Sequence, residues 1–254
     1  MGSGVPLVDW AFSAVLLSLR IAPVFALAPP FTLTRVPATF RALFGVGVAA
    51  CMASGLPADA AIADLSAGGL LVAAARELAL GGIFVMAFQV TFGAIYFVGR
   101  TLDIQAGFGL AMLIDPTTNN QTPLIGTLFA YLAGAIFFAM DGHGQLLRIF
   151  AATLDAMPLG AGHFPASTQS LTRFISIVFL TGFGVGGGAI LCLFLADLAI
   201  TALSRTVPQM NVLILGLQVK GLLLLVVLPA TFGVAGSLLA RMMVILLESL
   251  PGLL

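Results

Sequence analysis

The sequence predicts an all-α, integral membrane-type protein built from about six hydrophobic, partly broken helices and hairpins. Of its 254 residues, 60% are hydrophobic and only 8% are charged, and the mean hydropathy is +1.16. A soluble domain carries about 25% charged residues because water must wet its surface, so lipid or partner subunits must cover this chain. Several apolar runs also approach the ~20 residues that a helix needs to cross a hydrocarbon layer.

The first half of the chain contains three apolar segments of helical length. Residues 7–28 form the first, which is interrupted by Asp9 and Arg20 and followed by several prolines. Residues 42–56 form a short second segment that glycine breaks, and residues 78–99 form a third without any charge. Short segments bounded by proline are typical of half-hairpins as well as of full membrane crossings.

Three further apolar segments and one amphipathic helix follow. Residues 123–140 end at a glycine-containing turn, and residues 174–196 and 221–240 carry no charge. Between them, apolar residues recur at helical spacing over residues 145–157, with Arg148 and Asp155 on other faces, which predicts a short amphipathic helix. The sequence therefore predicts one helical membrane domain.

Four ionisable residues lie within or beside these apolar segments, where a charge costs about 2.5–3.5 kcal/mol on insertion scales. They are Arg20, Arg76, Glu77 and the single lysine, Lys220. Because adjacent helical residues point about 100° apart, we expect Arg76 and Glu77 to find partners on different neighbours. A structural ion pair and a proton relay are both open, although a relay usually uses several Asp, Glu and His residues.

The sequence contains patterns that resemble motifs of soluble enzymes, but the residues around them do not fit those motifs. Glycines at the spacing of a nucleotide-binding loop lie inside an uncharged run and not between a strand and a helix. Pairs of them stand four residues apart, which predicts close helix packing; these are Gly182, Gly184, Gly186 and Gly188. The two histidines and two cysteines lack the spacing of a metal site, and the formal net charge of +0 provides no basic surface for nucleic acid. We therefore expect no catalytic site, cofactor or nucleic-acid partner.

Residues 101–122 join two apolar segments without being clearly helical or clearly polar. Two glycines loosen this segment, phenylalanine and methionine give it soft apolar bulk, and an Asp-Pro pair ends it. The residues concerned are Gly107, Phe108, Gly109, Met112, Asp115 and Pro116. Such a loop suits a plug that seals a pore against ions, and a connector buried against other subunits fits the composition equally well.

The order of these motifs resembles the FliR family of flagellar export-gate proteins, with the injectisome SctT proteins as close relatives. The resemblance covers nearly the whole chain, and its most specific part is the block Pro208, Gln209, Met210, Asn211 and Val212, followed by Lys220. Other parts are Arg20 with Pro29, Pro37 and Arg41; Arg76 with Glu77; residues 103–108; Gly142 with His143; and residues 157–160. One departure is Gly216-Leu217-Gln218-Val219, where the family usually has a proline that would kink the helix.

This resemblance implies a non-enzymatic subunit of the type III export gate in the bacterial inner membrane, at the flagellar basal body. Such a subunit assembles with FliP, FliQ and FlhB and passes unfolded flagellar proteins. It further implies one domain over residues 1–254, with a FliP-like part over 1–200 and a FliQ-like hairpin over 201–254. The loop from Gly107 to Pro116 would lie at the closed pore, and Pro208, Gln209, Asn211 and Lys220 would pack where the hairpin turns.

Two other functions remain open at this stage. An injectisome SctT-type subunit is separated from a flagellar one only by details such as Gly216, which precedes the lysine and favours the flagellar family. A small-solute secondary transporter could use Arg20, Glu77 and Lys220 as a midplane site, although the chain has no evident inverted repeat. An intramembrane enzyme would need a nucleophile and base or a metal constellation, which the sequence lacks.

Overall fold

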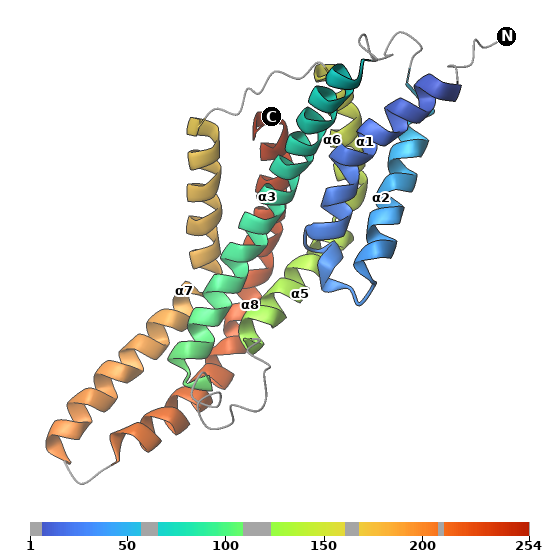
Figure 1. Cartoon of the computed structure of the whole chain (residues 1–254). Coiled ribbons are helices and arrows are strands. Elements are labelled where there is room, and N and C mark those ends of the chain that lie inside the picture. The colour runs from blue at the N-terminus through green and yellow to red at the C-terminus, as the bar shows by residue number, and fades with distance from the viewer. Residues whose placement is uncertain (1–6, 57–65, 109–122, 161–167, 208–210, 254) are drawn as a thin grey trace. The chain divides into compact units, whose positions relative to one another are not determined.

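The computed structural model describes residues 7–56, 66–108, 123–160, 168–207 and 211–253, and every regular element among them is a helix (Figure 1). The prediction of an all-α membrane-type protein is therefore confirmed. In chain order the elements are α1 (Leu7–Leu27), the short 3-10 helix η1 (Phe31–Leu33), α2 (Ala38–Ala53), α3 (Ala67–Gln105), α5 (Leu124–Ala139), α6 (Gly142–Ala156), α7 (Thr168–Thr206) and α8 (Val212–Leu253).

Proline sets several of the helix boundaries. Proline has no backbone N–H and restricts the residue before it, so it fits the start of a helix and the region just after its end. Accordingly α2 begins directly after Pro37, α5 begins directly after Pro123, and α6 ends before Pro158. The amphipathic helix predicted over residues 145–157 corresponds to α6, in which Leu146 and Phe150 are buried.

Helices α3, α7 and α8 are longer than the apolar segments that predict them, whereas α2 is short and α5 is bent against α6, which lowers the number of possible membrane crossings. By length and composition four of the described helices could cross a membrane, namely α1, α3, α7 and α8, with a fifth if α5 and α6, which are bent by 68°, count as one. Helix α2 has 16 residues and is about 24 Å long, which is shorter than a hydrocarbon layer of about 30 Å. Each of the six apolar segments falls mostly within one helix, but by this measure they provide four or five crossings.

The chain divides into two compact units. The first consists of Met1–Val90, Phe137–Phe174 and Ile245–Leu254. In Figure 1, α1 and α2 of this unit lie side by side and run in opposite directions. Their backbones approach closely, because a Cβ atom on Gly45 of α2 would lie 2.6 Å from the Cα atom of Ala22. Phe84 of α3 packs on Phe150 of α6 with ring centroids 4.8 Å apart, which joins these two helices to the same core.

The second unit consists of Thr91–Ile136 and Ile175–Val244. It contains the second half of α3, most of α5, and the long stretches of α7 and α8 that form an antiparallel hairpin (Figure 1). Aromatic rings join these helices: Phe97 of α3 lies 6.0 Å from Phe183 of α7, and Phe129 of α5 lies 5.8 Å from Phe232 of α8. The core of this unit is therefore made of apolar side chains from four helices.

Candidate functional site

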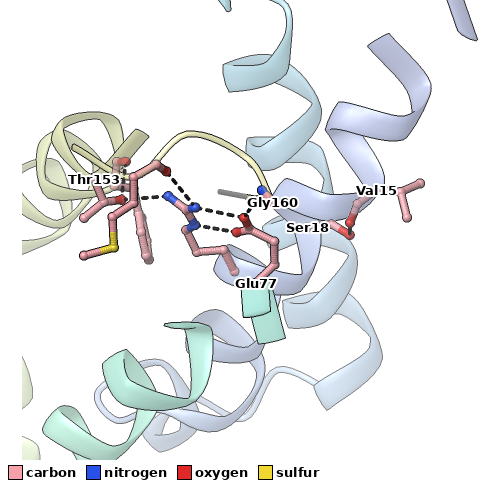
Figure 2. Close-up of polar contacts among 8 residues, drawn as sticks. Val15, Ser18, Glu77, Thr153 and Gly160 are labelled. Carbon is pink, nitrogen blue, oxygen red and sulfur yellow. Dashed lines mark hydrogen bonds and ion pairs between the residues drawn. The ribbon is translucent and has the colours of Figure 1, made fainter. Parts of the chain in front are cut away.

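A buried ion pair joins α1 to α3 in the first unit. Nε of Arg20 donates to Oε2 of Glu77 at 2.6 Å, and Nη2 of Arg20 donates to Oε1 at 3.0 Å. The two side chains are 0% and 1% exposed, so water does not screen their attraction. The guanidinium group also donates to the hydroxyl of Thr153 on α6 at 3.3 Å and to the carbonyl oxygen of Met157 at 3.1 Å. Figure 2 shows Glu77, Thr153 and Gly160 around this guanidinium group.

The local sequence explains why these two side chains meet. Gly81 lies four residues after Glu77, on the same face of α3. A Cβ atom at Gly81 would lie 2.7 Å from the carbonyl oxygen of Leu19 and 2.8 Å from that of Arg20. Only glycine permits this close approach of the two backbones, and the approach brings Glu77 within reach of Arg20.

The turn after α6 completes this cluster. Gly160 has a φ of +74°, a conformation that favours glycine. Its N–H donates to Oε1 of Glu77 at 3.2 Å, and its carbonyl oxygen accepts from Nη1 of Arg76 at 2.8 Å. Arg76 and Glu77 therefore bind opposite sides of one residue and do not pair with each other. We call Arg20, Glu77, Thr153, Met157 and Gly160 the α1–α3–α6 clamp.

The clamp has the chemistry of a structural element. Its contacts, as far as the described residues show them, end on a threonine hydroxyl and on backbone groups, which do not form a proton relay. Removing one partner of a buried ion pair leaves a charge without compensation, at a cost of about 3–5 kcal/mol. The clamp thus ties three helices and one turn of the first unit together. A role of Arg20, Arg76 and Glu77 in subunit packing stays a prediction.

The second unit contains another buried carboxylate, at the start of the segment that the sequence predicts to be either a plug or a buried connector. Asp103 of α3 is 4% exposed. Its carboxylate accepts the backbone N–H of Ile125 at 3.1 Å and that of Gly126 at 3.4 Å. These N–H groups belong to the first turn of α5, where no helical partner exists for them. Asp103 therefore caps α5 from a different helix, and it fixes the two ends of residues 104–123 to each other.

A glycine contact accompanies this cap. Gly99 of α3 faces Gly126 of α5 so closely that a Cβ atom at Gly99 would overlap the backbone of Gly126. At Gly126 the nearest atom to such a Cβ would be the carbonyl oxygen of Tyr96, at 3.0 Å. The close crossing and the cap together place the start of α5 against the end of α3.

Only the first residues of the predicted plug lie within the described part of the chain. Gly107 follows α3 with a φ of +87°, and a Cβ atom there would overlap the side chain of Leu217 on α8. Phe108 comes next and is partly exposed. Gly109, Met112, Asp115 and Pro116 lie outside the described residues. The assignment of this segment to a pore stays a prediction.

The polar residues of the C-terminal hairpin are partly described. Nζ of Lys220 on α8 lies 2.8 Å from Oδ1 of Asp197 on α7, which joins the two helices. Asn211 directly precedes α8, and its side-chain oxygen accepts the N–H of Ile214 at 3.3 Å, as a helix cap does. Pro208 and Gln209 lie outside the described residues.

The four glycines predicted to pack closely lie in α7 and differ in their surroundings. A Cβ atom at Gly182 would contact Ala94 at 3.4 Å, and one at Gly184 would contact Leu238 at 3.4 Å. Gly186 is the tightest of the four, against Val98 of α3, whereas Gly188 has no atom within 4 Å of a Cβ position.

Sequence reasoning missed the capping role of Asp103 and the close contacts at Gly81, Gly99 and Gly126. An available signal was an acidic residue at the end of an apolar helix, which needs a partner in a membrane. The glycine contacts had a weaker signal, because the chain contains 29 glycines and sequence alone does not say which of them face a backbone. Among the described residues no group of three or more His, Cys, Asp or Glu side chains could hold a metal ion.

The chain matches the model of a family described as bacterial export proteins, family 1, over residues 11–245. It is 27% identical to the flagellar biosynthetic protein FliR of Bacillus subtilis (strain 168), over 84% of this chain and 83% of that protein. It is 25% identical to the flagellar biosynthetic protein FliR of Escherichia coli (strain K12), over 89% of this chain and 82% of that protein. It is also 28% identical to the secretion system apparatus protein SsaT of Salmonella typhimurium, over 61% of each.

These similarities confirm the resemblance to the FliR family that the motifs indicate. The family model covers all five described stretches at least in part, from α1 to the last turns of α8. With several helices apolar and long enough to cross a bilayer, the protein is a membrane component. The chain therefore belongs to the bacterial export proteins, family 1.

Proposed function

We propose that this chain is a non-enzymatic subunit of the flagellar type III export gate in the bacterial inner membrane, at the flagellar basal body. In this proposal it assembles with FliP, FliQ and FlhB around a closed conduit for unfolded flagellar proteins. In this proposal residues 1–200 form the FliP-like part and residues 201–254 the FliQ-like part, which contains the end of α7 and the whole of α8. The observation that carries the proposal is the family match over residues 11–245.

The geometry of the second unit supports a gate. A plug must yield to a passing chain and still return to one position, so its two ends must be fixed. Asp103 provides such a fixed point, because its carboxylate binds the first turn of α5 while its own helix leads into Gly107 and Phe108. Phe108 and Met112 supply the apolar surface that can exclude ions from a constriction by dewetting.

An injectisome subunit is the second candidate. The name of SsaT refers to a secretion system apparatus, and that protein matches over 61% of this chain. The FliR proteins of Bacillus subtilis and Escherichia coli match over 84% and 89% of it. The longer match favours the flagellar system.

A solute transporter receives less support from the described contacts. Its midplane site would require Arg20, Glu77 and Lys220 to be available to a substrate. Arg20 and Glu77 instead bind each other, and Lys220 binds Asp197. Their charges are therefore already compensated within the chain.

Conductance of the assembled gate tests the proposal. The full chain is expressed together with the FliP and FliQ proteins of its own organism, and the purified complex is reconstituted in a planar bilayer. We expect low conductance for the wild type and clearly higher conductance for Phe108→Ser and Met112→Ser. Phe194→Ser is the matched control, because Phe194 is a 51% exposed phenylalanine on α7, outside the loop.

Two results would contradict the proposal in different ways. A chain that purifies alone under these conditions, without the other subunits, would argue against an export-gate subunit. A confirmed complex whose conductance is the same for wild type, Phe108→Ser and Met112→Ser would remove the loop from the seal.

A further inference from the structure

The first turn of α2 contains an arginine, Arg41, whose side chain is not fully satisfied by the part of the chain that the structure describes. Nε and Nη1 of Arg41 are both buried, and neither has a hydrogen-bond partner among the described residues. A guanidinium group stays protonated in proteins, so these two buried N–H donors of a positively charged group lack an acceptor. Burial of an uncompensated charge is strongly unfavourable, which means that the isolated chain presents an incomplete site.

Aromatic side chains surround this arginine. Arg41 lines an open cavity of about 300 Å³, together with Phe25 of α1 and with Phe40 and Phe44 of α2. Phe25 is buried and packs edge-on against Phe44, with ring centroids 5.2 Å apart. Phe40 and Phe44 are 67% and 62% exposed, although both are large and apolar. The cavity thus combines apolar walls with one cationic side chain. A ligand that fits it has a negatively charged group surrounded by apolar groups.

The helix end adds to the positive potential at this site. Pro37, which precedes α2, forms no side-chain cap, and the first turn of α2 contains no acidic residue. The N-terminus of a helix has a partial positive charge, which favours anions and disfavours a cation such as Arg41. Two independent features, the uncapped turn and the unpaired guanidinium, therefore call for the same kind of ligand.

We propose that this cavity is the docking site for an acidic side chain of a neighbouring export-gate subunit. The partner presents an Asp or Glu flanked by apolar residues, so that its carboxylate reaches Arg41 while the apolar residues cover Phe40 and Phe44. Arginine and large aromatic residues together are typical of the anchoring residues of protein interfaces. The inference rests on the proposed function, because it requires that the chain works within a complex.

A phospholipid headgroup is the competing ligand, and the partial burial of the Arg41 guanidinium group argues against it. An arginine that binds lipid phosphates extends along the helix and keeps its charged group in the wet interface. Here two of the three guanidinium nitrogens of Arg41 are hidden beneath protein atoms. This position suits a dry contact between proteins.

The test uses the full chain expressed with the other gate subunits. Charge reversal by Arg41→Glu is expected to lower the yield of complex about tenfold or more, because it places like charges in the contact. Arg41→Gln keeps most of the side-chain shape, and it should weaken the complex while making the isolated chain more stable, since it removes an unpaired buried charge. Arg35→Gln is the control, because Arg35 is an exposed arginine in the connection that leads into α2.

A photoreactive benzophenone side chain at Phe40 identifies the ligand. We expect its adduct, after digestion and mass spectrometry, to map to a gate-subunit peptide that contains an Asp or Glu. Changing that residue to Arg should restore the yield of complex in the Arg41→Glu variant.

Several outcomes would overturn the inference. The inference is wrong if the Arg41→Gln and Arg41→Glu chains assemble as well as the wild type. It is also wrong if the photoreactive side chain forms adducts with lipid only. An isolated Arg41→Gln chain that is less stable than wild type would also overturn it, because Arg41 would then have a partner within the chain. If the wild-type chain fails to bind the other subunits, both this inference and the proposed function are wrong.

Discussion

The α1–α3–α6 clamp allows a quantitative prediction of protein stability, because its two charged groups neutralise each other away from water. We consider Arg20→Met and Glu77→Leu, singly and together. Each single change leaves the other charge buried without a counter-charge, which should lower the free energy of unfolding by about 3–5 kcal/mol. Independent effects would add to about 6–10 kcal/mol for the double variant.

The double variant should lose much less than that sum. With both charges gone, the groups left without partners are the N–H of Gly160 and the carbonyl oxygen of Met157. An unsatisfied buried group costs about 1–3 kcal/mol, so the double variant should lose about 2–6 kcal/mol. The expected coupling between Arg20 and Glu77 is therefore about 4 kcal/mol.

The single tryptophan provides the measurement. Trp10 lies on α1 in the same compact unit, and its indole N–H donates to the hydroxyl of Ser54 at 3.1 Å. Its fluorescence should follow unfolding of this unit as sodium dodecyl sulfate is added to mixed micelles. The control is Arg148→Met, whose arginine is 77% exposed on α6 and should change stability by about 0.5 kcal/mol or less. Additive effects of the two clamp variants, or single effects below about 1 kcal/mol, would refute the reasoning.

Three further predictions concern other contacts. Asp103→Leu removes the acceptor for the first turn of α5, so hydrogen exchange of the Ile125 amide should become faster, and Asp103→Asn should restore part of the protection. Gly81→Ala should destabilise the chain because the new methyl group meets backbone oxygens, whereas Gly82→Ala, with open space around it, should stabilise it by up to about 1 kcal/mol; calorimetry of the two variants gives the signs. Lys220→Met breaks an ion pair that is partly open to water. The free energy of unfolding of this variant, measured in the same micelle titration, should therefore fall by only about 1 kcal/mol or less.

The sequence predicts the helices well and their contacts poorly, for a physical reason. Apolar composition and helix-breaking prolines are local properties, and they locate every described α-helix, although α3, α7 and α8 extend well beyond their apolar segments. Arg20 and Glu77 bind each other although they are 57 residues apart in the chain, so no local pattern connects them. The cap at Asp103 is likewise a contact with a different helix, 22 residues further along the chain. Composition therefore indicates that buried charges need partners, and only the fold says which partners they have.

The two buried carboxylates of α3 suggest why charges persist in so apolar a chain. Glu77 accepts the N–H of Gly160, at the turn after α6, and Asp103 accepts N–H groups at the start of α5. In both cases the donors belong to a break between helices, where the backbone cannot satisfy itself. Without water such groups are costly, and a carboxylate is the strongest acceptor that a side chain can offer. The two carboxylates of α3 thus satisfy the backbone donors of neighbouring turns, and a conservative change such as Glu77→Gln tests packing before it tests transport.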